Sequence, residues 1–427
     1  MPKKRTFQSL RGIRDILPQD EGVWNFVVST CERVAYAYGF KRIKTPILEE
    51  TELFCRSVGA TSDIVKKEMF SFRTQGGEDV TVRPEFTAGI MRAYIEHGLM
   101  NLPKPVKVFQ TGECFRYERP QSGRLRQFHQ FNPEIVGSAD ASSDAEIIAL
   151  SYVILRDLGI EVVMQVNSIG TPESRKRYIR HLKNYFEPKM RYLPKEEQER
   201  FKTNPLRLLD SKNKRCIEIA LEAPQIVDYL DEESKAHLMS LLEYMDEFDL
   251  PYALNPRIVR GLDYYTKTVF EIWAKDDDGT ARMNALGGGG RYDGLIAYLG
   301  GKDTPAVGVA LGIERIIAKM REKNLPIPND EQFSIFLAHL GDEASRKAFR
   351  LFEDLRAKGY KITWNLSKKS LKQQLEIADK LKVKITLILG QKEIAENLVL
   401  IKEMDMGAQE SVPVARLEKE LEKRLKN

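Results

Sequence analysis

Cysteine and histidine are scarce in this sequence, which has four cysteines and five histidines among 427 residues. The cysteines form no C-x-x-C pair and have no histidine at metal-ligand spacing; they are Cys31, Cys55, Cys114 and Cys216. Neither a disulfide framework nor a zinc site is therefore expected. No apolar run approaches the roughly 18 residues of a membrane span. Because the basic first five residues are not followed by the hydrophobic stretch of an export signal, we predict a cytoplasmic protein with no membrane association.

A strong charge of one sign is also missing. The net charge is +5, with 30% charged and 42% hydrophobic residues. This composition is typical of globular proteins, and the mild basic bias permits a nucleic-acid partner without requiring one. The chain is too long for a single compact core, so we expect two or three domains.

The segment from Gln110 to Gly137 has the clearest chemical pattern. Its two ends alternate apolar and polar residues as strands do, which predicts a hairpin. Residues of equal parity share one face of a strand, which predicts one common face for Arg116, Glu118, Gln130 and Glu134. Such a polar face is costly to bury unless it lines a wet or ligand-filled pocket. A bulge at Pro133 would change the parity of Glu134 relative to Gln130.

The turn of this hairpin, Arg119 to Arg126, contains three arginines together with proline, serine and glycine. Turn-forming residues of this kind predict an exposed basic loop that projects from the sheet. Such a loop suits a phosphate-bearing partner.

The run from Phe115 to Glu134 resembles motif 2 of the class II aminoacyl-tRNA synthetases, in the form found in the histidyl-tRNA synthetase family. The resemblance implies that Arg116 binds the α-phosphate of ATP and that Glu118 meets the adenine side. It also implies that the loop with Gln121 and Arg124 contacts the acceptor end of tRNA.

A second segment of this kind is Arg83-Pro84-Glu85-Phe86-Thr87, which precedes a predicted helix from Ala88 to His97. Thr87 is placed to cap that helix. The segment is similar to the family motif R-P-E-G-T-A, whose glutamate and threonine hold the α-amino group of the substrate. Phe86 stands where the family has glycine, while the polar residues are kept.

Adjacent tyrosines usually indicate packing, but Arg260-Gly261-Leu262-Asp263-Tyr264-Tyr265 as a whole resembles the signature peptide of histidyl-tRNA synthetases. The resemblance implies that Arg260 acts at the reacting carboxylate and α-phosphate, and that Tyr264 and Tyr265 belong to the histidine site. A neutral imidazole has one N–H and one acceptor, so Glu134 can accept from the first while Tyr265 donates to the second. The ammonium group of histidine is assigned to Glu85, Thr87 and Gln130, and Gln130 is also counted among the catalytic residues.

Two further segments complete the expected site. A glycine run lets the backbone approach a ligand closely, and the run here matches the family's glycine-rich pocket wall, with Gly287, Gly288 and Gly289. A strand from Ala306 to Leu311 leads into a helix from Ile313 to Glu322 and resembles motif 3, which implies that Arg315 binds ATP.

The domain prediction follows from these positions. Residues 1–170 and 251–325 are expected to form an α+β class II catalytic core with an antiparallel sheet of six to seven strands. Residues 171–250 are rich in lysine and predict a helical insertion, which either contacts tRNA or is simply solvated. Residues 332–427 predict an α/β anticodon-binding domain. A short strand from Lys41 to Glu52 that contains Pro46 resembles motif 1, which implies a homodimer.

We therefore predict an enzyme that activates L-histidine with ATP and Mg²⁺ to histidyl-adenylate and transfers the histidyl group to the 3′ end of tRNA(His). The sequence does not identify the ligands of the metal. The alternative is a catalytically inactive, histidine-sensing regulatory paralogue from histidine biosynthesis. The C-terminal domain and the arginines favour the enzyme.

Overall fold

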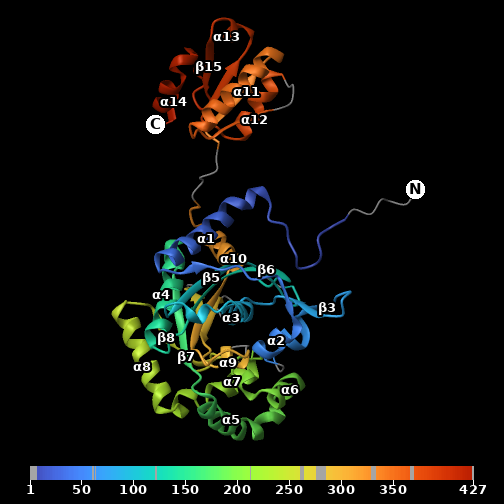
Figure 1. The fold of residues 1–427 in the computed structure, drawn as a ribbon, viewed down its shortest axis with the longest axis vertical. Coiled ribbons are helices and arrows are strands. Elements are labelled where there is room, and N and C mark those ends of the chain that lie inside the picture. Colours follow the sequence, from blue (N-terminus) through green and yellow to red (C-terminus); the bar gives the residue numbers. More distant parts are fainter. Residues whose placement is uncertain are drawn as a thin grey trace, which may run out of the picture. The chain divides into compact units, whose positions relative to one another are not determined.

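The structure is a computed structural model that describes residues 7–59, 62, 64–120, 123–211, 213–259, 264–275, 285–327, 333–365 and 370–425. The chain divides into two compact units, Met1–Ile327 and Pro328–Asn427 (Figure 1). No helix in the described ranges is both long and apolar enough to cross a membrane.

An eight-stranded sheet organises the first unit. Its six central strands are antiparallel and run in the spatial order β5 (Val106–Phe115), β6 (Gln127–Val136), β11 (Ala306–Gly312), β10 (Ala285–Arg291), β9 (Thr266–Ala274) and β7 (Val162–Ser168). Two short parallel strands flank them, β1 (Lys41–Arg42) beside β5 and β8 (Tyr252–Leu254) beside β7. The predicted antiparallel core is confirmed, with these two edge strands added to it.

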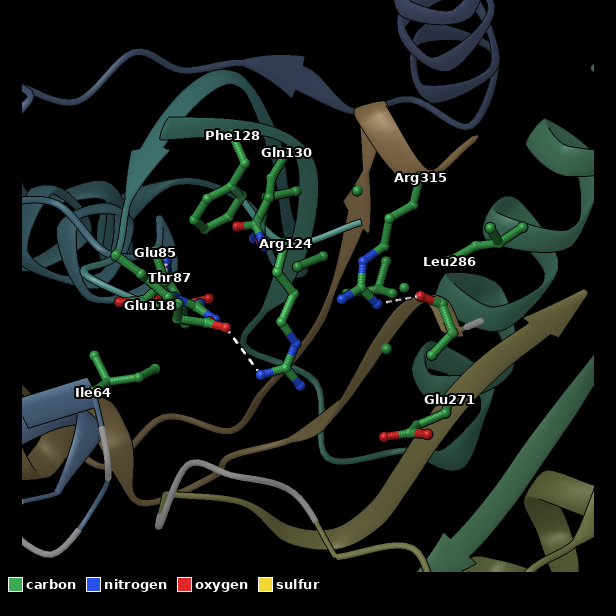
Figure 2. Close-up of a pocket in the computed structure, with 18 of the residues that line it drawn as sticks. Ile64, Glu85, Thr87, Glu118, Arg124, Phe128, Gln130, Glu271, Leu286 and Arg315 are labelled. Atoms are coloured by element: carbon green, nitrogen blue, oxygen red, sulfur yellow. Dashed lines mark hydrogen bonds and ion pairs between the residues drawn. The ribbon is translucent and has the colours of Figure 1, made fainter. Parts of the chain in front are cut away.

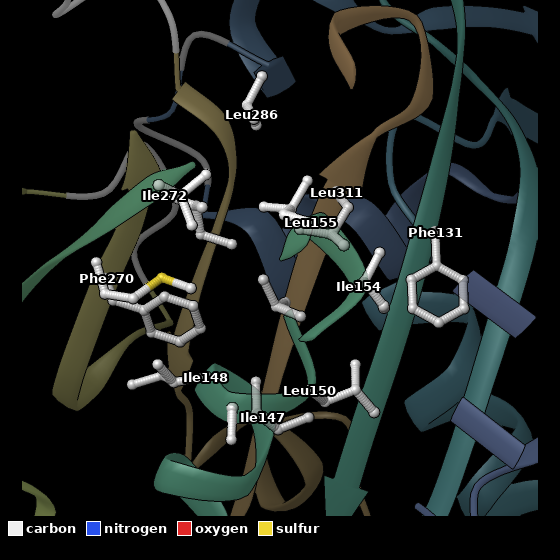
Figure 3. Close-up of a cluster of buried hydrophobic side chains, with 14 of the residues drawn as sticks. Phe131, Ile147, Ile148, Leu150, Ile154, Leu155, Phe270, Ile272, Leu286 and Leu311 are labelled. Carbon is white, nitrogen blue, oxygen red and sulfur yellow. The ribbon is translucent and has the colours of Figure 1, made fainter. Parts of the chain in front are cut away.

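One face of this sheet is covered by helices. The covering helices are α1 (Pro18–Ala37), α4 (Ala141–Asp157) and α10 (Ile313–Glu322), and α8 (Glu232–Glu247) packs beside α4. Apolar side chains of alternate strand positions, such as Phe131 and Ile272, meet Ile147 and Ile154 of α4 there (Figure 3). The strand residues between them point to the opposite face, which leaves that face for polar side chains.

A smaller sheet lies in the same unit, in the order β2 (Leu48–Glu50), β4 (Asp79–Val82) and β3 (Phe70–Arg73), followed along the chain by α3 (Thr87–Glu96). The prediction of one strand from Lys41 to Glu52 is wrong. The region forms β1 and β2, which belong to different sheets, and α2 begins at Thr51 and ends at Val58. Pro46 lies between the two strands, where its missing N–H breaks no ladder.

Between β7 and β8 the described residues are helical, as expected. The helices are α5 (Pro172–Phe186), α6 (Lys195–Thr203), α7 (Lys214–Leu221) and α8, and a short 3-10 turn spans Pro205–Leu208. These elements belong to the same compact unit as the sheet.

The second unit contains a five-stranded sheet in the order β13 (Ile362–Trp364), β12 (Ile335–His339), β14 (Ile385–Leu389), β15 (Leu398–Glu403) and β16 (Gln409–Pro413). The first three strands are parallel and the last two antiparallel. Its helices are α11 (Asp342–Ala357), α12 (Leu371–Lys380), α13 (Gln391–Ala395) and α14 (Leu417–Leu425). The expected α/β character is confirmed, while β15 and β16 were not predicted, because only three of their residues are buried.

Candidate active site

A cavity of about 430 Å³ lies on the polar face of the large sheet (Figure 2). It brings together most of the predicted site residues, namely Glu85, Thr87, Arg116, Glu118, Arg124, Gln130, Tyr264, Tyr265, Gly287, Gly288 and Arg315. Glu134 and Gly289 are not among the residues that line it. Arg260 and Gln121 lie outside the residues that the structure describes.

The hairpin of β5 and β6 pairs without a bulge, because each residue from Val106 to Phe115 has one partner between Val136 and Gln127. Pro133 therefore leaves the parity unchanged, and Gln130 and Glu134 share a face. The parity argument does not extend to Arg116 and Glu118, because β5 ends at Phe115. These two residues reach the cavity from the loop that follows the strand.

The predicted exposure of this loop is confirmed for Arg119, Gly123 and Arg124, but the loop also borders the cavity. Gly123 and Arg124 line it. Arg124 Nη1 donates to Glu118 Oε2 at 2.9 Å, and Arg315 Nε donates to the carbonyl of Gly123 at 3.1 Å. Charge pairing and backbone hydrogen bonding thus fold the loop over the cavity.

Glu85, and not Thr87, caps helix α3. Its carboxylate accepts the backbone N–H of Thr87 at 2.6 Å and that of Ala88 at 2.9 Å. The hydroxyl of Thr87 instead donates to Glu134 Oε1 at 2.7 Å. The predicted cap at Thr87 is therefore wrong, because a two-oxygen carboxylate satisfies two open N–H groups at once.

Phe86 fits the helix start without strain, since its φ is −98°. The ring is fully buried and lies 4.6 Å from the guanidinium carbon of Arg83. The backbone here does not require the glycine of the family motif.

Glu134 lies directly behind the cavity wall and has no exposed surface. Its carboxylate accepts hydrogen bonds from Thr87, from Asn132 Nδ2 at 2.7 Å, and from the hydroxyl of Tyr292. Burial raises the pKa of Glu134 to about 7, although these donors oppose the shift. A Cβ atom at Gly308 would lie 1.5 Å from Glu134 Oε2, so the glycine leaves room for the carboxylate.

Asn132 and Tyr292 line the cavity but were not predicted. Asn132 has the same parity as Gln130 and Glu134, which is a signal that could have found it. Tyr292 lies two residues after the glycine run. The preceding Arg291 is fully buried and donates to the carbonyl of Ser138 at 2.8 Å and to the carboxylate of Asp144, which anchors this end of β10.

Three tyrosine rings cluster at this end of the cavity. Tyr264 lies 4.7 Å from Tyr265 and 5.4 Å from Tyr292, measured between ring centroids. Burial raises the pKa of both Tyr264 and Tyr292 well above the usual range. Both phenols therefore stay protonated at neutral pH and can donate hydrogen bonds.

A second part of the cavity, called here its arginine end, carries arginines that the backbone holds in place. Arg116 Nε donates to the carbonyl of Pro84 at 2.9 Å, and Arg315 Nη1 donates to that of Ala285 at 2.6 Å. Burial, together with the charge of Arg124, lowers the pKa of Arg315. A guanidinium nevertheless remains charged in proteins, so this end of the cavity favours anions.

Four carboxylates that were not predicted also line the cavity, namely Glu68, Asp210, Glu271 and Glu314. Glu314 accepts the backbone N–H of His129 at 2.9 Å. No group of three or more His, Cys, Asp or Glu residues suited to a metal ion occurs in the part of the chain that the structure describes.

The first unit has the fold of a class II aminoacyl-tRNA synthetase. Its antiparallel sheet carries a cavity that lies between the hairpin resembling motif 2 and the helix resembling motif 3. Two family models match the chain, one described as histidyl-tRNA synthetase over residues 12–316 and one described as an anticodon binding domain over residues 332–424. The chain belongs to the histidyl-tRNA synthetase family, as the resemblance implied.

Individual relatives agree with this assignment. A histidine–tRNA ligase of Natranaerobius thermophilus is 41% identical over 413 residues, which cover 96% of this chain and 97% of that protein. A histidine–tRNA ligase of Dehalococcoides mccartyi is 43% identical over 423 residues, or 98% of this chain and 100% of the relative. The crystal structure of apo histidyl-tRNA synthetase from S. aureus matches with a TM-score of 0.81 and 34% identity, covering 97% of this chain and 99% of that one.

Proposed function

We propose that the protein is an ATP-dependent histidine–tRNA ligase. It joins histidine to AMP with release of pyrophosphate and then passes the histidyl group to the terminal ribose of tRNA(His). The observation that carries the proposal is one cavity lined both by arginines that backbone carbonyls hold in place and by protonated tyrosines, with the buried carboxylate of Glu134 behind its wall accepting a hydrogen bond from Tyr292. Full-length histidine–tRNA ligases at 41% and 43% identity support it.

In the first step, the carboxylate of histidine attacks the α-phosphate of ATP. Arg116 and Arg315 would hold the phosphates, and Glu118 would meet the adenine. Arg260 would bring the two reacting anions together, a role that rests on the signature peptide. The physical task is to position the two anions and to stabilise the charge that grows on the phosphate oxygens.

The ammonium group of the substrate is assigned to Glu85, Thr87 and Gln130. The imidazole is assigned to the tyrosine end, where Tyr264 and Tyr265 line the cavity and Glu134 lies behind Thr87, Asn132 and Tyr292. Fixed polar partners reject an apolar side chain because they would be left unpaired, which is worth roughly 10⁴-fold discrimination in comparable sites.

Mg²⁺ would enter with ATP, because such ions are commonly held by substrate phosphates and one or two carboxylates. The cavity carboxylates that were not assigned to another ligand are Glu68, Asp210, Glu271 and Glu314, and the described residues offer no all-protein cage. When bound, the ion neutralises charge on the phosphates.

The second substrate, tRNA(His), would meet the loop with Gln121 and Arg124 at its acceptor end and the domain of residues 332–427 at its anticodon. We also propose the division into catalytic segments 1–170 and 251–325 around a helical insertion of residues 171–250. The motif 1 resemblance supports a homodimer, and tRNA charging supports a cytoplasmic location.

The experiment that tests the function is ATP–pyrophosphate exchange with each of the twenty amino acids, repeated on Glu134→Ala. Exchange driven by histidine alone, and lost in the variant, is expected. If histidine binds but no amino acid drives exchange, the regulatory paralogue becomes the better assignment. A solved structure whose title names both an ATP phosphoribosyltransferase regulatory subunit and a histidyl-tRNA synthetase shares this fold at 21% identity.

A further inference from the structure

The helical segment between β7 and β8 shares one hydrophobic core with the tyrosine end of the cavity. Its buried members in this core include Tyr178, Leu182, Leu206 and Leu208, and the pocket side contributes Tyr265 and Tyr292. Arg207 and Asp210, which belong to the same segment, line the cavity themselves. The tyrosines that line the cavity therefore pack against the inserted helices.

A direct polar link joins this segment to the signature tyrosines. Arg175 lies in the first turn of α5, and its Nη1 donates to the backbone carbonyl of Tyr265 at 2.9 Å. The side chain of Tyr265 lines the cavity and only 5% of the residue is exposed. Arg175 itself is not among the cavity-lining residues, so it holds the tyrosine from behind.

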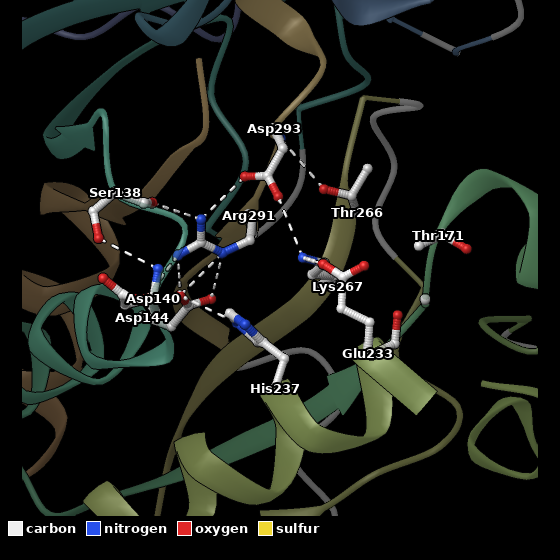
Figure 4. Close-up of polar contacts among 12 residues, drawn as sticks. Ser138, Asp140, Asp144, Thr171, Glu233, His237, Thr266, Lys267, Arg291 and Asp293 are labelled. Atoms are coloured by element: carbon white, nitrogen blue, oxygen red, sulfur yellow. Dashed lines mark hydrogen bonds and ion pairs between the residues drawn. The ribbon is translucent and has the colours of Figure 1, made fainter. Parts of the chain in front are cut away.

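A second link follows two residues later, where β9 enters the sheet. Lys267 has a φ of +47°, a left-handed conformation that costs a side-chain-bearing residue about 1 kcal/mol or more. Its N–H donates to the carbonyl of Gly170 at 3.0 Å, and its carbonyl accepts the N–H of Ile169 at 2.8 Å. Its Nζ contacts Glu233 Oε1 of α8 at 2.6 Å (Figure 4).

The two helices that make these links are fastened to each other. Thr171, the N-cap residue of α5, donates through its hydroxyl to Asp231 Oδ2 at 2.8 Å. Asp231 is the N-cap residue of α8 and accepts the N–H of Ser234 at 2.8 Å. The N-termini of α5 and α8 are thus fixed to each other, and α5 contacts Tyr265 while α8 contacts Lys267.

We infer that Arg175 is a positioning residue for histidine recognition, acting through the main chain of Tyr265, so that the helical insertion takes part in amino-acid selection even without tRNA. The inference rests on the proposed function, because it presumes that Tyr265 belongs to the histidine site. The helical insertion would thus contribute to the binding of histidine, before tRNA enters the reaction.

The test compares Arg175→Ala with Arg177→Ala, a matched control on the same helix whose Nη2 reaches only the carbonyl of Tyr229, at 3.5 Å. Loss of a charged hydrogen bond to Tyr265 is expected to raise the KM for histidine in pyrophosphate exchange about tenfold. The KM for ATP should stay within about twofold, because the arginine end of the cavity is untouched. Arg175→Lys should recover part of the loss, since an ammonium group can donate to a single carbonyl.

Calorimetric titration of each variant with histidine separates this inference from the proposed function. If the wild-type protein binds histidine but catalyses no pyrophosphate exchange, the proposed function is wrong. The inference can still hold in that case, and Arg175→Ala should then bind histidine about tenfold more weakly than wild type. Equal histidine affinity in the two alanine variants, or an equal loss for histidine and ATP, overturns the inference. If wild-type protein binds no histidine, both fail. If Arg175→Ala does not fold, Arg175→Lys takes its place, and an affinity equal to that of wild type is then the overturning result.

Discussion

At the scale of single residues, the buried carboxyl of Glu134 is the most unusual chemical group of the site. It has no exposed surface, and its partners are two hydroxyls and one amide. None of these partners carries a positive charge, so burial dominates and raises the pKa of Glu134 to about 7. The group therefore titrates near neutral pH.

A pH dependence of stability follows. The pKa of Glu134 is about 7 in the folded chain against an ordinary value of 4.5, so between these values the folded state binds more protons than the unfolded state. The free energy of unfolding of the first unit should fall as the pH rises through this window, by an amount on the order of 2 to 3 kcal/mol. Glu134→Gln should remove this part of the slope.

The measurement is denaturant unfolding at pH 5 and pH 8, followed by tryptophan fluorescence, with and without Glu134→Gln, in a Trp364→Phe background whose remaining tryptophans, Trp24 and Trp273, both belong to the first unit. An identical pH slope in both proteins would show that Glu134 ionises normally.

The hollow at Gly308 gives a second prediction at this scale. Gly308→Ala places a Cβ atom against Glu134 Oε2, and overpacking of this kind costs roughly 1–3 kcal/mol. We expect a lower melting temperature and weaker histidine binding. Gly294→Ala is the matched control, because nothing lies within 4 Å of its Cβ position and its φ is −85°. Similar melting temperatures and histidine affinities in both variants would contradict the packing argument.

At the scale of elements, helices and strands with a regular local pattern could be predicted from the sequence, while those that depend on neighbouring strands could not. The alternation in β5 and β6, the apolar run of β11 and the helix α10 are strong local signals, and the structure has these elements. β10 contains four consecutive glycines, which carry no strand signal, so no strand was predicted there. The segment is a strand because it pairs with β9 on one side and β11 on the other. Glycine is needed there because the neighbouring backbone is close: a Cβ at Gly289 would lie 2.0 Å from the carbonyl oxygen of Gly308.

The candidate site shows the same division. Motif residues such as Arg116, Gln130 and Arg315 could be predicted because local sequence places them. Asn132 has the same parity as Gln130 and Glu134 on one strand, so the same local argument could have predicted it. Arg207 and Asp210 could not be predicted, because they reach the cavity only through the packing of a distant helical segment.

The paired helix starts at Thr171 and Asp231 give a prediction at this scale. Burial by itself raises the pKa of Asp231, but the N–H of Ser234 and the hydroxyl of Thr171 outweigh it and hold the pKa well below the ordinary 3.8. Its stabilising effect is therefore present above that value and is lost as the pH falls below it. Asp231→Ala should lower the free energy of unfolding by about 1–2 kcal/mol at pH 7.

Glu232→Ala is the control for this change, because the side chain of Glu232 is 92% exposed. Chemical denaturation at pH 7 and pH 3 measures both variants. Equal stability of the two variants at pH 7 would rule out the cap.

At the scale of the whole molecule, each of the two units has its own hydrophobic core. All the described residues that line the cavity belong to the first unit. Histidine activation should therefore need residues 1–327 alone, while tRNA charging should need both units.

Truncation after Ile327 tests this division. We expect histidine-driven pyrophosphate exchange within about threefold of wild type and a loss of tRNA charging of at least about a hundredfold, because a fully formed anticodon contact is worth several kcal/mol. Addition of separately purified residues 328–427 should restore little charging, since linkage supplies a high effective concentration. A truncated chain that charges tRNA normally would contradict the assignment of the second unit.

The way in which Glu134 is enclosed also bears on how this pocket can evolve. Its carboxylate is packed against Gly308 and shared among donors from three separate elements, α3, β6 and the end of β10. A mutation at one of these positions leaves a buried partner unpaired, so its effect depends on what occupies the others. Changes of amino-acid preference at this site should therefore be strongly epistatic, and most single-mutation paths to a new substrate should pass through unstable intermediates.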